Sequence, residues 1–150
     1  MPRPGLAAQV DLLDVNVWVA LSTSEHPHHA RAQHFWQVES GERLAFCRVT
    51  VLGFLRLTTN ATVMGGLPLT AAEAWAAYSA WRKLDDVWVA SEPDGCDVLL
   101  ADWAGRGIVT PRLWTDAYLA AFARAGGHRL VSFDRDFTRF DGLDLLQLDV

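Results

Sequence analysis

The sequence is poor in cysteine, in basic residues and in long apolar segments, and each shortage excludes a class of protein. Its two cysteines, Cys47 and Cys96, form no Cys-x-x-Cys pair, so no disulfide framework is indicated and a reducing compartment is favoured. No apolar run approaches the roughly 20 residues that a membrane span needs. No apolar stretch of secretory type follows Arg3 near the N-terminus. We therefore expect a cytoplasmic protein with no membrane partner.

Positive charge is scarce, because the net charge is −5 and Lys83 is the one lysine beside twelve arginines. A protein that binds nucleic acid through a basic surface would usually be positive. An acidic metal pocket with a small basic rim is still compatible with a nucleic-acid enzyme. The shortage of lysine argues against a phosphatase that uses Asp14 as its nucleophile, and against a receiver domain. Both need a lysine near the phosphate, and Lys83 lies at the end of a helix just before a strand.

Apolar residues are plentiful at 51%, with seven tryptophans, which is enough for the core of one domain over residues 1–150. Short apolar runs alternate with longer helical stretches, a pattern typical of βαβ units. We expect strands near 9–13, 44–47, 87–90, 129–133 and, at an edge, 143–148. Helices are expected over 15–21, from Pro27 to Gly41, over 49–58, over 70–84 behind a Thr70–Glu73 capping box, over 94–104, and from Thr115 or Asp116 to Gly126. The sequence thus predicts an α/β fold, a three-layer α/β/α sandwich with a mainly parallel central sheet.

Three aspartates stand where a predicted strand and a predicted helix meet. Asp14 follows the first strand, Asp134 follows the strand that ends near residue 133, and Asp116 opens the apolar helix at 117–123. In an open parallel sheet, ligands bind outside the carboxyl ends of the strands. We therefore expect these three carboxylates to converge there.

Local structure offers another interpretation of each aspartate. An aspartate after a strand is usually a helix N-cap, and Asp116 is the one most easily explained in this way. Asp134 and Asp136 bracket Arg135, a pattern that also fits a simple Asx turn. Asp14 lies among apolar residues, and a carboxylate so enclosed is rarely buried without a partner. The three together are more informative than any one of them.

Converging carboxylates repel one another, so one must be protonated or a cation must bind. Mg²⁺ or Mn²⁺ suits an all-oxygen site, and such an ion can activate water and stabilise the leaving oxygen in phosphodiester cleavage. We expect Asp14 and Asp116 to hold the ion directly, and Asp134 to position a second ion or the attacking water. The hydrogen-bonding partners expected around these ligands are Asn16, Thr115 and Ser132.

Three motifs carry a family resemblance: Leu-Leu-Asp-Val-Asn-Val-Trp at 12–18, Trp-Thr-Asp-Ala-Tyr-Leu at 114–119 and Val-Ser-Phe-Asp-Arg-Asp-Phe at 131–137. Together and in this order they resemble the PIN-domain family, and more narrowly its VapC ribonuclease toxins of type II toxin–antitoxin modules. The resemblance implies an endoribonuclease that depends on Mg²⁺ or Mn²⁺. It also implies a homodimer, a cognate VapB-type antitoxin that neutralises it, and a structured RNA substrate. It makes Asp14 and Asp116 the metal ligands, and Asp134 completes the catalytic set.

The chain departs from the family pattern at one position. PIN domains usually carry a glutamate on the helix after the second strand, and its equivalent here is Gly53, with no acidic residue anywhere in 50–72. Asp136 is then a candidate substitute, and a second metal would bind weakly or only with RNA. Arg48 or Arg56 on that helix would contact a substrate phosphate, although an exposed arginine is also commonplace. The alternative function is a non-catalytic PIN-like module that binds RNA or protein through an incomplete acidic site.

Overall fold

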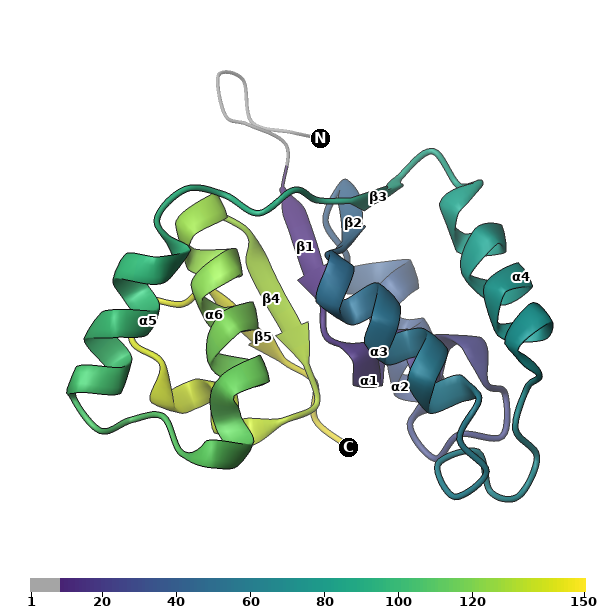
Figure 1. Cartoon of the computed structure of the whole chain (residues 1–150). Coiled ribbons are helices and arrows are strands. Elements are labelled where there is room, and N and C mark those ends of the chain that lie inside the picture. Colours follow the sequence, from purple (N-terminus) through teal and green to yellow (C-terminus); the bar gives the residue numbers. More distant parts are fainter. Residues whose placement is uncertain (1–8) are drawn as a thin grey trace.

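The computed structural model describes residues 9–150, in which five parallel strands lie between two layers of helices (Figure 1). The segment around Arg3 lies outside these residues. The strands are β1 (Val10–Leu13), β2 (Arg43–Phe46), β3 (Val87–Val89), β4 (Arg129–Ser132) and β5 (Leu145–Gln147). Their order is β3-β2-β1-β4-β5, and every neighbouring pair is parallel. The predicted parallel sheet and the edge position of the last strand are therefore confirmed.

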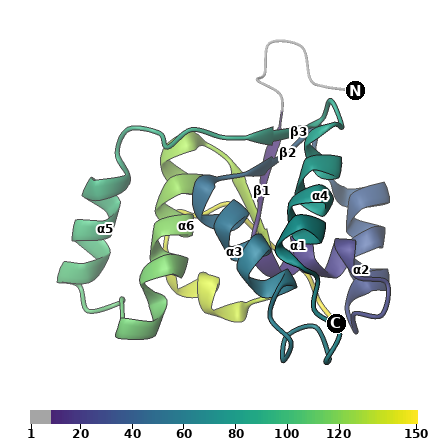
Figure 2. The same ribbon diagram turned by 45° about the vertical axis from the view of Figure 1, so that its right-hand side comes forward.

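The helices divide between the two faces of the sheet (Figure 2). One face carries α1 (Val15–Ser22), α2 (His29–His34) with a π-helical turn (Phe35–Glu39), α3 (Arg48–Thr58) and α4 (Ala71–Arg82). The other face carries α5 (Cys96–Gly105) and α6 (Trp114–Gly126), and short 3-10 turns occupy Pro111–Leu113 and Arg135–Arg139. Among residues 9–150, no helix combines the length and the apolar character needed to cross a membrane.

Alternation along the strands explains the three layers. Leu13 and Phe46 point into the core that α1 to α4 cover, while Leu12 and Ala45 point into the core beneath α5 and α6. Because successive side chains of a strand face opposite sides, both faces of this apolar sheet must be covered by helices. The predicted α/β/α sandwich is confirmed.

Three predicted helix starts are wrong, and two of them are those of α2 and α5. α2 begins at His29 behind His28, not at Pro27, because backbone hydrogen bonds fold the preceding residues into consecutive turns. α5 begins at Cys96 behind Gly95, whose positive φ of 98° turns the chain, so Asp94 does not cap it.

The start of α6 differs in a way that matters for the acidic site. The 3-10 turn Pro111–Leu113 runs directly into the helix, and Leu113 takes the N-cap position. Thr115 and Asp116 therefore lie inside the first turn and neither caps the helix, contrary to the prediction. The carboxylate of Asp116 has no capping role and is available to a ligand.

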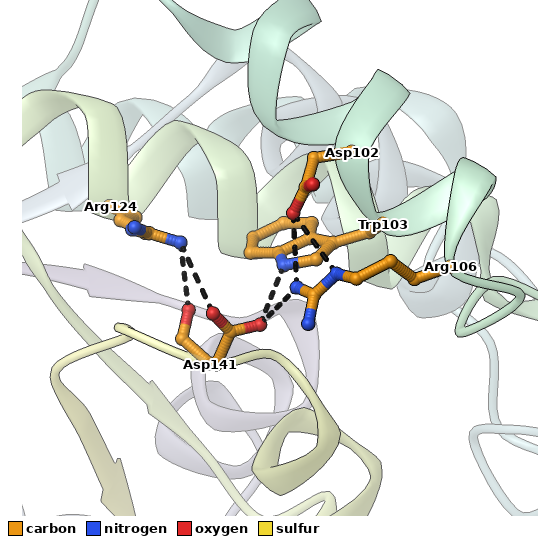
Figure 3. Close-up of polar contacts among 5 residues, drawn as sticks. All are labelled: Asp102, Trp103, Arg106, Arg124 and Asp141. Atoms are coloured by element: carbon orange, nitrogen blue, oxygen red, sulfur yellow. Dashed lines mark hydrogen bonds and ion pairs between the residues drawn. The ribbon is translucent and has the colours of Figure 1, made fainter.

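Polar contacts join α5 and α6 to the loop before β5 (Figure 3). Asp141 accepts hydrogen bonds from the indole of the buried Trp103 and from Arg106, while Arg124 donates to the backbone carbonyl of Asp141. Arg106 also pairs with Asp102 one helical turn earlier. These contacts fix the layer that carries Asp116 against the β4–β5 side of the sheet.

Candidate metal site at the carboxyl edge of the sheet

Asp14 follows β1 and is held rigidly. It occupies the N-cap of α1, where its Oδ1 accepts a hydrogen bond of 2.7 Å from the backbone N–H of Val15. Its Oδ2 accepts one of 2.8 Å from the hydroxyl of Ser132 on the neighbouring strand β4. Asp14 is 9% exposed, and burial raises the pKa of this carboxyl although both hydrogen bonds oppose the rise. Asp14 is thus a helix cap and also a fixed carboxylate facing the edge.

Asp116, Asp134 and Asp136 form a compact group beside this edge. One oxygen from each carboxylate lies within 4.8 Å of the others. Asp134 caps the turn after β4 by accepting a hydrogen bond of 2.8 Å from the backbone N–H of Asp136. The Asx-turn interpretation of this pair is therefore confirmed, and the same turn brings both carboxylates to face the first turn of α6.

The negative charge of Asp14 acts on this group of aspartates. Burial and, to a smaller extent, the negative charges of Asp14, Asp134 and Asp136 together raise the pKa of Asp116 to about 6, while Arg112 opposes them. The charge of Asp134 likewise contributes to the raised pKa of Asp14. Asp14 is not among the three aspartates whose oxygens lie within 4.8 Å of one another, but the hydroxyl of Ser132 links its carboxylate to the backbone of Asp134. A single site formed by Asp14, Asp116 and Asp134 therefore stays a prediction.

Of the three expected hydrogen-bonding partners, Ser132 and Asn16 form hydrogen bonds at this site, whereas Thr115 forms none among the described residues. Ser132 is fully buried and connects three groups, since its hydroxyl donates to Asp14 and accepts from the backbone N–H of Asp134 at 2.9 Å. Asn16 donates to the same hydroxyl at 3.3 Å and accepts weakly from the N–H of Phe133 at 3.4 Å. Thr115 is exposed, and its side chain makes no hydrogen bond within the part of the chain that is described.

Gly53 lies in the middle of α3, buried against Val15. A Cβ atom added to Gly53 would lie 2.7 Å from Cγ2 of Val15, closer than such atoms approach in proteins. The isopropyl group next to Asp14 therefore fills the space into which a longer residue at position 53 would begin to grow. The glycine is evident from the sequence, but only the structure shows that Val15 occupies the space beside it.

The two arginines predicted to contact a phosphate lie in different places, and a third arginine contacts the acidic group directly. Arg48 opens α3, directly after the carboxyl end of β2, and is exposed. Arg56 lines a hollow between α3 and α4 together with Trp75. Arg112 was missed, yet its Nη1 donates to Oδ2 of Asp136 at 2.9 Å. In the sequence, the only sign of this contact is that Arg112 stands four positions before Asp116, and such a spacing is too common to be informative.

The chemistry of this donor set fits a hard divalent cation. Asp116, Asp134 and Asp136 gather at the carboxyl edge of the sheet, with Asp14 linked to them through Ser132, and Mg²⁺ or Mn²⁺ prefers such oxygen ligands. Asp14 and Asp116 could hold such an ion, with Asp134 and Asp136 as further carboxylates near it. An arrangement of this kind can bring a phosphodiester and a water molecule together.

Comparisons with known proteins agree with this geometry. A profile of the PIN domain matches residues 12–143. The chain is 45% identical over 140 residues to Ribonuclease VapC41 of Mycobacterium tuberculosis, a match that covers 89% of this chain and 95% of that protein. It is 36% identical over 126 residues to Ribonuclease VapC39 of the same species, covering 82% of this chain and 87% of that protein.

Solved structures share the fold at low sequence identity. VapBC2 from Rickettsia felis, solved bound to a DNA fragment from its promoter, superposes with a TM-score of 0.68 at 13% identity, covering 94% of this chain and 100% of that chain. Mycobacterium tuberculosis VapC20, described as a Sarcin-Ricin loop cleaving toxin, superposes with a TM-score of 0.66 at 18% identity, covering 89% and 97%. These matches support the same sandwich architecture.

Proposed function

This chain belongs to the PIN-domain family, and we propose that its carboxylate edge is the metal-dependent active site of an endoribonuclease toxin of the VapC type. The observation that carries the proposal is the group of Asp116, Asp134 and Asp136, whose oxygens lie within 4.8 Å of one another, with Asp14 joined to it through the hydroxyl of Ser132. A ribonuclease that is 45% identical over nearly the whole chain supports the reaction. The carboxylates support the dependence on a divalent ion.

We assign the residues their roles from their positions. Asp14 and Asp116 would hold Mg²⁺ or Mn²⁺, which supplies an activated water and charge stabilisation for phosphodiester hydrolysis. Asp134 and Asp136 would orient the attacking water or a second ion. Ser132, with Asn16 behind it, keeps Asp14 and the turn at Asp134 in fixed positions relative to each other.

Purified chain, free of any partner, should cleave RNA in the presence of Mg²⁺ or Mn²⁺. Cleavage should stop with EDTA, which removes the ion, and in Asp14→Asn, which replaces a buried, negatively charged metal ligand by a neutral amide. A matched control is Asp144→Asn, which removes an exposed carboxylate from the opposite end of β5. A chain that cleaves no RNA pool and binds no metal would instead be a non-catalytic binding module, the alternative that Gly53 raises.

The same assignment predicts toxicity in cells. Expression of the chain alone should arrest growth of a bacterial host, and Asp116→Asn should relieve the arrest. Arrest that persists in this variant, at equal protein level, would mean that toxicity does not come from cleavage at this site.

The partner we propose is a VapB-type antitoxin, supported by solved VapBC complexes with the same fold. Two hollows that share Leu21 and Trp81 lie where α1, α2 and α4 meet, and Trp36 and Leu84 line their outer parts. An apolar surface of this kind suits an amphipathic helix of a partner. Co-expression with a reading frame adjacent in the genome should yield a stable complex, and Trp81→Glu should weaken it. A complex that is unaffected by Trp81→Glu would place the antitoxin elsewhere.

We further propose a homodimer of single-domain chains that acts in the cytoplasm, where its RNA substrate is found. Light scattering should give twice the chain mass, and thermal unfolding should occur in one cooperative transition. A monomeric mass at all concentrations would refute the dimer without affecting the active-site assignment.

A further inference from the structure

Arg112 projects from the 3-10 turn before α6 and contacts the acidic group from its outer side. Its Nη1 lies 2.9 Å from Oδ2 of Asp136, and Arg139 approaches the other oxygen of that carboxylate at 3.5 Å. Asp136 is one of the three aspartates whose oxygens lie within 4.8 Å of one another. A cationic side chain of the protein therefore already faces the position that a divalent ion would use.

The charge of Arg112 acts on more than its direct partner. The guanidinium also interacts with the charges of Asp134 and Asp116, and it opposes their mutual repulsion. Arg112 thus serves the acidic group as a counter-ion. A metal ion that binds the same carboxylates would be repelled by the positive charge of Arg112 and would compete with it for Asp136.

The pairing is also easy to break. The side chain of Arg112 is 68% exposed, and an exposed ion pair contributes little because water and salt screen it. A metal can therefore release the guanidinium without disturbing the fold. Once released, it stays next to the metal site, and arginine is well suited to contact a phosphate through two parallel N–H groups.

We propose that Arg112 is a built-in counter-ion of the acidic group, displaced by the divalent ion and then used to bind a phosphate of the RNA substrate. The second step, the binding of an RNA phosphate, rests on the proposed ribonuclease function. The first step, displacement of Arg112 by the ion, does not. Arg112 is thereby a substrate-positioning residue that weakens metal binding in the free protein and strengthens RNA binding in the loaded one. Loss of its side chain should change these two properties in opposite directions.

Calorimetric titration with Mn²⁺ alone tests the first step. Arg112→Ala should bind Mn²⁺ about two- to fivefold more tightly than the unaltered chain, as expected when an exposed ion pair no longer competes. Arg135→Ala is the matched control, since Arg135 is exposed between Asp134 and Asp136 but makes no ion pair within residues 9–150. Unchanged or weaker binding in Arg112→Ala, or an equal gain in Arg135→Ala, would overturn the proposal. An unaltered chain that takes up no Mn²⁺ would overturn it together with the metal site.

Steady-state cleavage of RNA at saturating Mn²⁺ tests the second step. Arg112→Ala should raise KM about tenfold or more with a smaller change in kcat, and Arg112→Lys should recover part of the loss, because charge is kept but the paired N–H groups are not. An unchanged KM in Arg112→Ala would overturn the phosphate contact. If no variant cleaves RNA but Arg112→Ala still binds Mn²⁺ more tightly, the ribonuclease proposal fails and the counter-ion role stands.

Discussion

The hydroxyl of Ser132 donates a hydrogen bond of 2.8 Å to Oδ2 of Asp14, across the boundary between β4 and β1. The hydroxyl oxygen of Ser132 in turn accepts a hydrogen bond of 2.9 Å from the backbone N–H of Asp134. One buried hydroxyl therefore sets the spacing between two carboxylates that are 120 positions apart in the chain. Its geometry makes Ser132 a positioning residue for the metal site.

Ser132→Ala should reduce Mn²⁺ affinity and RNA cleavage by about 10- to 100-fold, the usual cost of removing a hydrogen bond that orients a metal ligand. The change also removes the interaction that lowers the pKa of Asp14, so the remaining activity should need a higher pH. Metal titration and a pH profile of cleavage measure both effects, with circular dichroism as the check on folding. Full activity in a folded Ser132→Ala variant would show that Asp14 does not depend on this contact.

The sequence was sufficient for the architecture because the architecture depends on local patterns. Each of these patterns involves only a few neighbouring residues. Examples that the structure contains are the alternation of strands with helices, the Thr70–Glu73 capping box, and the glycines that end α6. The position of Asp14 and Asp134 at the same edge was also predictable, since they follow the carboxyl ends of two parallel strands that pair with each other.

What the sequence could not reveal depends on contacts between distant segments. The start of α6 was misjudged because a 3-10 turn at Pro111–Leu113 continues into the helix, a detail that propensity does not specify. The pairing of Arg112 with Asp136 joins two connecting turns 24 positions apart. The contact of Val15 with Gly53 depends on how α1 packs on α3.

Asp116 should make the metal-free protein more stable in mild acid than at neutral pH. Its pKa of about 6 in the folded state lies above its ordinary value of 3.8, so the folded chain binds the proton more tightly than the unfolded chain. The free energy of unfolding therefore gains from this group as pH falls through about 6, and the gain is complete below about 4. In EDTA, Asp116→Asn should be the more stable form near neutral pH, and its stability should vary less between about pH 7 and about pH 4.

Denaturant unfolding of both proteins across this pH range, with and without Mn²⁺, measures the effect. The ion should stabilise the unaltered chain near neutral pH and lose its effect as pH falls through about 6, because protons and metal compete for the same carboxylate. Parallel pH profiles for Asp116→Asn and the unaltered chain would show that Asp116 titrates normally.

The contact of Gly53 with Val15 predicts a coupling between two substitutions. Gly53→Ala places a methyl group against Cγ2 of Val15, and overpacking costs about 1–3 kcal/mol, which exceeds the helix propensity of up to about 1 kcal/mol that alanine adds. In a Val15→Ala background the space is free, so the same change should stabilise the chain. Urea unfolding of the two single variants and the double variant gives the coupling energy, expected to be about 1–3 kcal/mol. Additive effects would mean that the two residues are not in contact.

A buried ion pair at the opposite end of the sheet should control stability without touching the metal site. Arg129 on β4 makes two hydrogen bonds, of 2.8 and 2.9 Å, to the carboxylate of Asp11 on β1, and a third to the backbone carbonyl of Glu39. Asp11 is fully buried and also accepts the N–H of Gly41 at 2.7 Å. The pair therefore joins two strands to the loop that leads into β2.

Arg129→Ala should lower the free energy of unfolding by about 3 kcal/mol, because it leaves the carboxylate of Asp11 buried without its cation. For a domain of this size that corresponds to a fall of about 6–12 °C in Tm. Adding Asp11→Asn should recover part of the loss, since the unpaired charge is then removed. Mn²⁺ affinity at a temperature where all variants are folded should stay unchanged. A change in metal affinity with no fall in Tm would mean that the two ends of the sheet are coupled and that Arg129 acts on the site rather than on the fold.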